Sequence, residues 1–159
     1  VGGAHADRLL RLRETGTLEF VAWLSGCAMR PRQAGLKNLD PYVLCDYVLQ
    51  FVALARQLLR QHFRPGTSAL VRLELHHARE WRLPRGRTTS DDLAFGLDRW
   101  GACKRDEYGT PELRITAATD PDLAARDLTR ELYRAFGLGW QDVFYYDDDG
   151  HLRPWEQIC

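Results

Sequence analysis

The chain has 159 residues, of which 45% are apolar or aromatic and 28% are charged. This length and composition are typical of one globular domain and exclude a disordered chain. The 22 basic residues are balanced by 22 acidic ones, which excludes wholesale binding to a phosphate backbone. No run of 18 apolar residues predicts a membrane span, and no signal peptide is visible. Because the first residue is Val, we expect residues 1–159 to be one domain excised from a longer protein.

The N-terminal part is expected to be helical. Residues 5–14 are polar with several leucines, and residues 17–26 carry an apolar run that fits a helix or a buried strand. We favour a helix in both places, interrupted at Gly16. Residues 27–39 contain Pro, Gly and Asn with scattered basic residues, which predicts a loop.

The sequence gives its clearest prediction for a long helix over residues 41–62. Asp40 can accept hydrogen bonds from the free N–H groups at a helix start, and Pro41 needs no donor there. Apolar residues then recur every three or four positions, as in an amphipathic helix. This stripe consists of Leu44, Tyr47, Val48, Phe51, Leu54, Ala55 and Leu58.

From Ser68 apolar and polar residues alternate, which predicts strands. We expect strands over residues 69–83, 93–104 and 112–118. A mobile connection over 83–92 joins the first two, and a turn at Gly109 and Pro111 joins the last two. Such an antiparallel meander would be covered on one face by the helix over 41–62.

A second helix is predicted over residues 121–136, where Asp120 caps the start and Gly137 ends it. Residues 143–155 predict a hairpin with a two-residue turn at Asp149-Gly150. The fold class is therefore α+β, with a mainly antiparallel four- to five-stranded sheet covered by helices on one face, in the order α-α-β-β-β-α-β-β. As an alternative, the last predicted helix and its flanking strands could form a βαβ unit in a mixed sheet.

The predicted strand over 69–83 carries the one anomaly in the chain. His77 and Arg79 fall on the face that also holds Leu73, Leu75 and Trp81. Burying such groups without partners costs several kcal/mol, so three explanations compete. A bulge could change the register at His77, or both residues could lie at a sheet edge; we favour these two together. In the third explanation they line a cleft.

If such a cleft exists, further residues can be proposed to line it. Arg99 shares the alternation phase of the apolar residues before it, Trp81 and Trp100 could stack on a ligand, and Tyr145 or Tyr146 could offer a hydroxyl. Guanidinium, imidazole and aromatic groups together suit an anionic or nucleotide-like ligand. The ligand-binding residues are thus predicted to be His77, Arg79, Arg99, Trp81, Trp100 and Tyr145.

Other site chemistries find little support. His76 and His77 point to opposite sides of a strand, and adding Cys103 or His151 matches no zinc spacing, so we expect no metal. No GxGxxG, Walker A or GxSxG motif occurs, and we expect no cofactor. The four cysteines are far apart and are interpreted as reduced thiols of a cytoplasmic protein, with two disulfides in a secreted protein as the alternative. They are Cys27, Cys45, Cys103 and Cys159.

The basic run Arg79, Arg82, Arg85 and Arg87 is interpreted as a solvated loop, although local contact with nucleic acid stays open. Twenty of the 22 basic residues are arginines, which is typical of a GC-rich genome and favours a bacterial source. Charge is uneven along the chain, with a net +4 over residues 1–64 and −5 over residues 120–159. Such asymmetry could serve a protein partner or a homodimer.

The favoured function is a non-catalytic, regulatory ligand- or partner-binding module of a larger cytoplasmic protein. One alternative is a hydrolase of phosphate esters, with His77 as general acid or base and Arg79 stabilising the oxyanion. The other is a protein–protein interaction domain.

Overall fold

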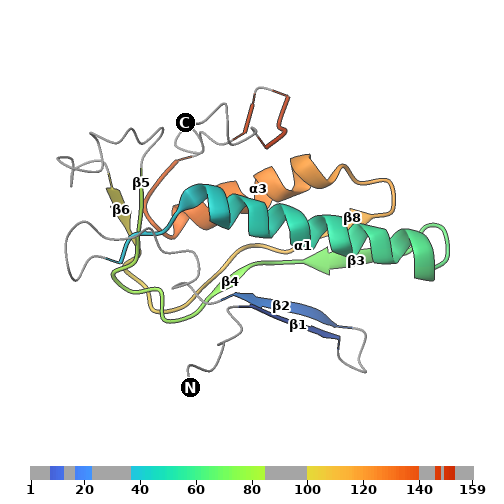
Figure 1. Ribbon diagram of the computed structural model, residues 1–159, viewed down its shortest axis with the longest axis horizontal. Helices are drawn as coiled ribbons and strands as arrows, with labels where there is room; N and C mark the ends of the chain where they lie inside the picture. The colour runs from blue at the N-terminus through green and yellow to red at the C-terminus, as the bar shows by residue number, and fades with distance from the viewer. Residues whose placement is uncertain are drawn as a thin grey trace, which may run out of the picture.

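The computed structural model describes residues 8–12, 17–22, 37–84, 100–139, 146–147 and 149–152, with residues 8–12 and Trp100 described by their backbone only. These residues form two helices that lie side by side and eight short strands that pair two by two (Figure 1). Every one of these strand pairs is antiparallel. The α+β class is therefore confirmed. One sheet of four or five strands is not, because the described strands form four separate two-stranded sheets.

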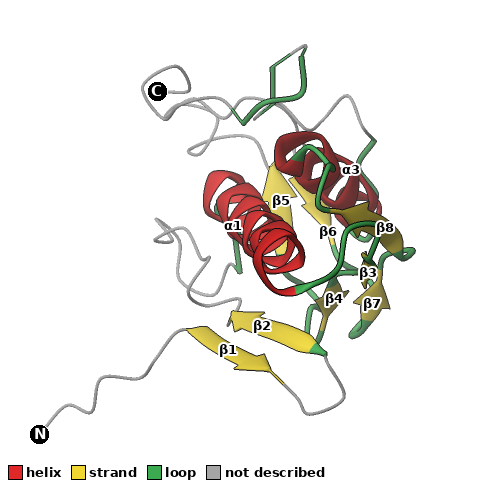
Figure 2. Cartoon of the chain, turned by 90° about the vertical axis from the view of Figure 1, so that its right-hand side faces the viewer, coloured by secondary structure: helices red, strands yellow, loops and turns green. Residues whose placement is uncertain are grey.

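The N-terminal residues form a hairpin of β1 (Arg8–Leu12) and β2 (Leu18–Ala22), and the helices predicted over 5–14 and 17–26 are wrong. Within β2 the apolar residues Leu18, Phe20 and Ala22 recur at every second position, which is a strand period. Helices of about ten residues are marginal in water by themselves, so strand pairing prevails. In Figure 2 this hairpin lies beside α1, away from α3.

Helix α1 (Pro41–His62) matches the predicted range 41–62. Asp40 caps it as expected, because its side chain accepts hydrogen bonds from the backbone N–H groups of Tyr42 and Val43, at 2.9 and 3.3 Å. The helix buries one side completely: its buried residues are Pro41, Leu44, Cys45, Val48, Val52 and Leu59.

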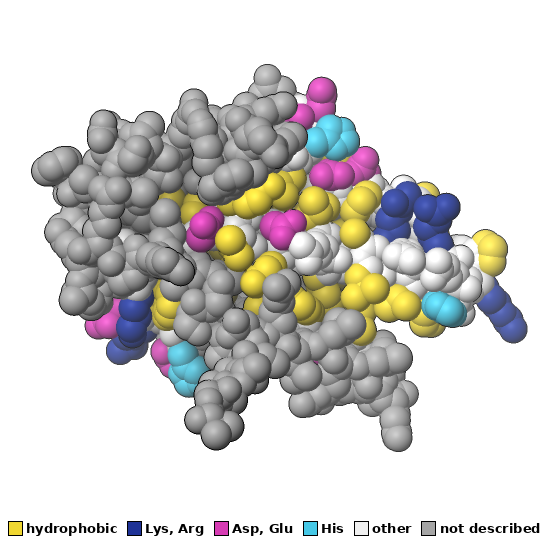
Figure 3. Space-filling view, viewed as in Figure 1, with side chains coloured by type: hydrophobic (Ala, Val, Ile, Leu, Met, Phe, Trp, Pro, Cys, Tyr) yellow, Lys and Arg dark blue, Asp and Glu magenta, His cyan; other side chains and the backbone are white. Residues whose placement is uncertain are grey.

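A second side of α1 is only half-buried and meets the hairpin. The Phe20 ring lies edge-on to Tyr47, with centroids 5.8 Å apart, and stacks on Phe51 at 6.1 Å. Figure 3 shows apolar side chains over this part of the surface. Within the described residues α1 is also the one helix long and apolar enough to span a membrane, which is weak evidence because core helices of soluble proteins have the same composition. Its contacts with α3, β3 and β8 lead us to interpret it as a core helix.

Two chain segments, 68–84 and 100–116, run antiparallel along their whole length and form three successive strand pairs. They are β3 (Ser68–Val71) with β8 (Leu113–Thr116), β4 (Glu74–Leu75) with β7 (Tyr108–Gly109), and β5 (Arg82–Pro84) with β6 (Trp100–Ala102). The long strand predicted over 69–83 is thus broken into β3, β4 and β5. The structure describes only part of the strand predicted over 93–104, namely β6 and the two residues after it. The connection predicted over 83–92 lies mostly outside the described residues.

The pairing register shifts by one residue on each side of β4. Val71 pairs with Leu113, whereas Leu75 pairs with Tyr108, so one extra residue lies on the second segment between these pairs. The register returns before Leu83, which places the next extra residue on the first segment. Each extra residue is a bulge, and bulges bend a ribbon and end its regular pairing.

Helix α3 (Pro121–Arg134) confirms the predicted second helix, and Asp120 caps it. Gly137 ends it in the left-handed region with φ +71°, as predicted. Tyr146 and Leu152 form an antiparallel bridge, which confirms a hairpin there, although the turn differs from the prediction. The Gly150 N–H donates to the Asp147 carbonyl, so Gly150 is the fourth residue of this turn and not one of its central two.

Candidate functional site

His77 and Arg79 lie on an exposed turn where the first segment of the ribbon bulges outward. His77 has φ +55° and Glu80 has φ +71°, and no residue of a regular strand adopts such values. The His77 side chain is 90% exposed, and its Nδ1 lies 3.6 Å from an Asp106 carboxylate oxygen. Arg79 is exposed as well. Of the two explanations that we favoured together, the structure shows the bulge, and the inward orientation on which the cleft depended is wrong.

The remaining predicted ligand-binding residues do not assemble around His77. Trp81 is half-buried against the core cluster that contains Leu83 and Cys103. The backbone of Trp100 belongs to β6, whereas its side chain, Arg99 and Tyr145 lie outside the described residues. Ligand binding by these residues stays a prediction.

Charged side chains surround the same bulge at the surface. His76 Nε2 lies 3.3 Å from Glu74 Oε2, and its Nδ1 lies 3.7 Å from Glu107 Oε1. Arg72 also contacts Glu74. In the part of the chain that the structure describes, no three His, Cys, Asp or Glu side chains form a group that could hold a metal ion.

Within the described part of the core, Cys45, Thr129 and Tyr146 form a polar cluster. The Thr129 and Tyr146 hydroxyls lie 3.4 Å apart, and both lie within hydrogen-bonding reach of the fully buried Cys45 thiol. Burial raises the pKa of the Cys45 thiol and of the Tyr146 hydroxyl far above their ordinary values. A nucleophilic cysteine needs its thiolate, which this raised pKa disfavours, and the cluster connects Cys45 of α1 with Thr129 of α3. Cys45 and Cys103 are both free thiols.

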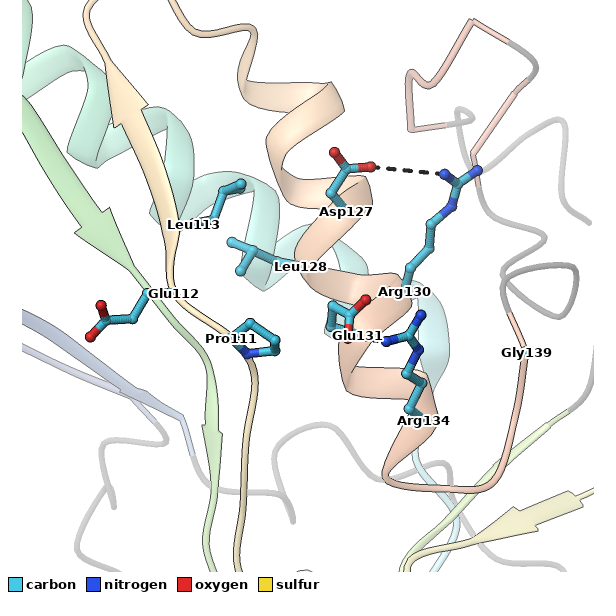
Figure 4. Close-up of a pocket in the computed structure, with 9 residues that line it drawn as sticks. All are labelled: Pro111, Glu112, Leu113, Asp127, Leu128, Arg130, Glu131, Arg134 and Gly139. Carbon is cyan, nitrogen blue, oxygen red and sulfur yellow. Dashed lines mark hydrogen bonds and ion pairs between the residues drawn. The ribbon is translucent and has the colours of Figure 1, made fainter.

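A groove of about 580 Å³ lies between α3 and the chain that leads into β8 (Figure 4). Its apolar lining consists of Pro111, Leu113 and Leu128, and Gly139 also lines it. Its charged lining consists of Glu112, Asp127, Arg130, Glu131 and Arg134. Helix α3 contributes most of these side chains because its buried side faces the core and leaves the next side open to the groove.

The arginines of the groove have carboxylates beside them on the same helix. Arg134 Nη1 lies 2.7 Å from Glu131 Oε2, and Arg130 Nη1 lies 3.8 Å from Asp127 Oδ1. Each pair spans three residues, so both arise from helical spacing. With both guanidiniums beside acids, the groove has no concentrated positive charge for a phosphate.

The orientation of the backbone in β8 follows from the hydrogen bonds at its two ends. Near its start, Thr110 N–H donates to the Leu73 carbonyl at 2.9 Å, so the backbone groups of Leu73 face the second segment. Backbone groups of successive strand residues point to alternate sides. The backbone N–H and C=O of Val71 therefore also face β8, where Val71 pairs with Leu113.

The same alternation turns the backbone of Arg114 away from β3. Thr116 lies two residues after Arg114 in β8, so its backbone groups should point the same way as those of Arg114, and they do. Thr116 N–H donates to Thr119 Oγ1 at 2.8 Å, and the Thr116 carbonyl accepts from Thr119 N–H at 3.1 Å. No described residue is within hydrogen-bonding distance of the Arg114 backbone groups. Among the described residues, no strand therefore pairs with this edge of β8, and its neighbour Leu113 lines the groove.

Sequence reasoning missed this groove, although two signals were present. Glu112, which precedes β8, and Arg114 within it lie two positions apart, and the helix carries alternating charges from Asp127 to Arg134. Either pattern is also typical of a solvated surface, and only the packing of α3 beside β8 brings them together.

No family model matches the chain, and neither a curated protein nor a solved structure matches it.

Proposed function

We propose that this chain is a non-catalytic interaction module that binds an extended polypeptide along β8, in the groove beside α3. The observation that supports the proposal is the outward-facing N–H and C=O of Arg114, which follows Leu113, a residue that lines the groove together with Pro111 and Leu128. Exposed strand edges bind extended chains by forming new backbone hydrogen bonds, and adjoining pockets select the side chains.

The size and lining of the groove support a polypeptide occupant. Pro111, Leu113 and Leu128 can take up one or two apolar side chains, and Glu112 lies beside them as an exposed carboxylate. Residues of a bound strand point alternately toward and away from α3, so apolar side chains at every second position would enter the groove.

The other two functions that the sequence suggested have less support. A small anionic ligand would need guanidiniums that are not already beside acids, whereas Arg130 and Arg134 each lie next to one. A phosphate-ester hydrolase would need its general base in a water-excluding site, and His77 lies on an exposed turn. Membership of a larger cytoplasmic bacterial protein, and a regulatory role in it, stay predictions.

The proposal is tested with a displayed library of random ten-residue peptides, selected against the protein immobilised at low density. Arg114→Pro removes the outward N–H without removing a ladder hydrogen bond to β3, so the fold should tolerate it. Leu70→Pro is the matched control, because Leu70 pairs with Arg114 and faces the opposite edge of the same strand pair.

We expect selected peptides to bind the wild type and Leu70→Pro but to lose at least about tenfold in affinity for Arg114→Pro. Circular dichroism spectra and melting temperatures identify variants that merely fail to fold. Peptides that bind Arg114→Pro as tightly as the wild type, or a selection that enriches none, would refute the proposal.

A further inference from the structure

Basic and apolar side chains are exposed together at the end of the molecule where α1 passes into β3. Residues 60–66 are all exposed, and a Cβ added at Gly66 would meet no atom within 4 Å, so this connection protrudes from the fold. Phe63 ends α1 and is 54% exposed. Figure 3 shows this end on the right, with basic, histidine and apolar side chains gathered on it.

Two side-chain hydrogen bonds bring further arginines to this surface. Arg114 donates to Ser68 Oγ at 2.8 Å, at the start of β3, and Arg56 Nε donates to the Ala117 carbonyl at 3.3 Å, after the end of β8. Leu70 pairs with Arg114 across the ladder and is 55% exposed. We call this surface the basic end. It consists of Arg56, Arg60, Arg64 and Arg114 with His62, Phe63 and Leu70.

The positive charge of the basic end is not compensated locally. Its two segments, 56–71 and 113–119, contain the four arginines and no Asp or Glu. Among the described residues, none of the four guanidiniums lies within ion-pair distance of a carboxylate. Asp120, the next residue, directs its carboxylate to N–H groups of α3. Arg56 and Arg60, four residues apart on one helix, repel each other, so a partner that supplies negative charge would relieve this repulsion.

We infer that the basic end docks on the surface of an anionic lipid bilayer, with Phe63 in the interfacial layer and the arginines beside lipid phosphates. Guanidinium forks match phosphate oxygens, and aromatic side chains favour the depth of the lipid headgroups. Exposed apolar area and attraction to anionic lipids together determine how strongly a protein binds a membrane surface. None of these residues lines the peptide groove, so the inference goes beyond the proposed function.

Two features favour a bilayer over a nucleic acid as the partner. Phe63 is the one Phe, Tyr or Trp in the two segments, and Leu70 has no π face on which a base could stack. The whole chain also has a net charge of zero, whereas domains that bind nucleic acid usually have a basic excess. A flat lipid surface needs only a protruding apolar residue with basic residues around it, which is what the connection after α1 offers.

Cosedimentation with lipid vesicles tests the inference. Vesicles of phosphatidylcholine alone are compared with vesicles that contain about one-third phosphatidylserine, and we expect binding to the anionic vesicles only, weakened by added salt. Each arginine near such a surface strengthens binding about fivefold, so the double variant Arg60→Gln, Arg64→Gln should bind about 25-fold more weakly. Phe63→Ala should weaken binding about fivefold, and Phe63→Trp should retain it, because Trp also favours the interface.

The matched control is the double variant Lys104→Gln, Arg105→Gln. It removes the same charge from two exposed residues that follow β6, at the other end of the ribbon, and should change binding by less than about twofold. Every substituted side chain is exposed, so melting temperatures should stay near that of the wild type. Equal binding to both kinds of vesicle, or equal losses for the control and the Arg60→Gln, Arg64→Gln variant, overturns the inference. Binding of a single-stranded oligonucleotide in place of vesicles also overturns it.

Discussion

Gly101 tests how closely β6 lies against the chain that follows α3. A Cβ added at this position would lie 2.3 Å from the Phe136 carbonyl oxygen and 2.7 Å from Leu138 Cγ, whereas ordinary contacts begin at 3.4 Å. The oxygen belongs to the backbone, so Gly101→Ala requires the ribbon and the end of α3 to separate by about 1 Å, and overpacking of this kind costs about 1–3 kcal/mol. We expect the upper end of this range, because rotating a side chain cannot relieve a clash with backbone.

Urea unfolding followed by circular dichroism measures this cost, with Gly109→Ala as the matched control. Gly109 lies on the same ribbon, and a Cβ there would meet only Arg72 Nη2, at 4.0 Å. A loss of 3 kcal/mol corresponds to a fall of about 6–12 °C in melting temperature for a domain of this size, whereas the control should change stability by less than about 0.5 kcal/mol. Equal stabilities of the two variants would refute the close packing of β6 on the end of α3.

Two further predictions concern α3 and the polar cluster beneath it. Asp120 accepts hydrogen bonds from the N–H groups of Asp122 and Leu123 at 2.9 and 3.2 Å. Asp120→Ala should therefore lower the free energy of unfolding by about 1 kcal/mol, and Asp120→Asn should lower it much less. Equal losses for the two variants in urea unfolding would contradict the capping role. Burial raises the pKa of the Cys45 thiol above its ordinary 9.0 and that of the Tyr146 hydroxyl above 10.0, so both groups ionise more readily in the unfolded chain. Their contribution to stability is complete below about pH 9 and is lost as the pH rises above it, and Cys45→Ala should lose less stability than the wild type between about pH 8 and pH 10.5. If the wild type is equally stable to urea at about pH 8 and at about pH 10.5, these two groups ionise without unfolding the protein, and the prediction is wrong.

Local signals in the sequence predicted the two long helices well. Asp40 with Pro41 and Asp120 with Pro121 are capping pairs whose chemistry involves only neighbouring residues, and each marks its helix start correctly. Gly137 marks the end of α3 for the same reason.

Features that depend on distant residues could not be predicted in this way. The hairpin of β1 and β2 was missed because its alternating pattern is short and its leucines also fit a helix. The bulge at His77 arises because the two segments of the ribbon differ by one residue between their paired strands, and neither segment alone reveals this difference. The binding groove depends on α3 packing beside β8, so its charges could be seen in the sequence but not brought together.

The most direct test of the central claim is residue-resolved amide hydrogen exchange in β8 as a function of the concentration of an added library peptide. At low concentration the Arg114 amide should exchange rapidly, because it faces away from β3, while the amide of Ile115 stays protected in the ladder. As the peptide concentration rises, the Arg114 amide should become protected in step with peptide binding. Protection of Arg114 at every concentration would show that the edge is already covered within one copy. Rapid exchange at every concentration would show that no second strand pairs there.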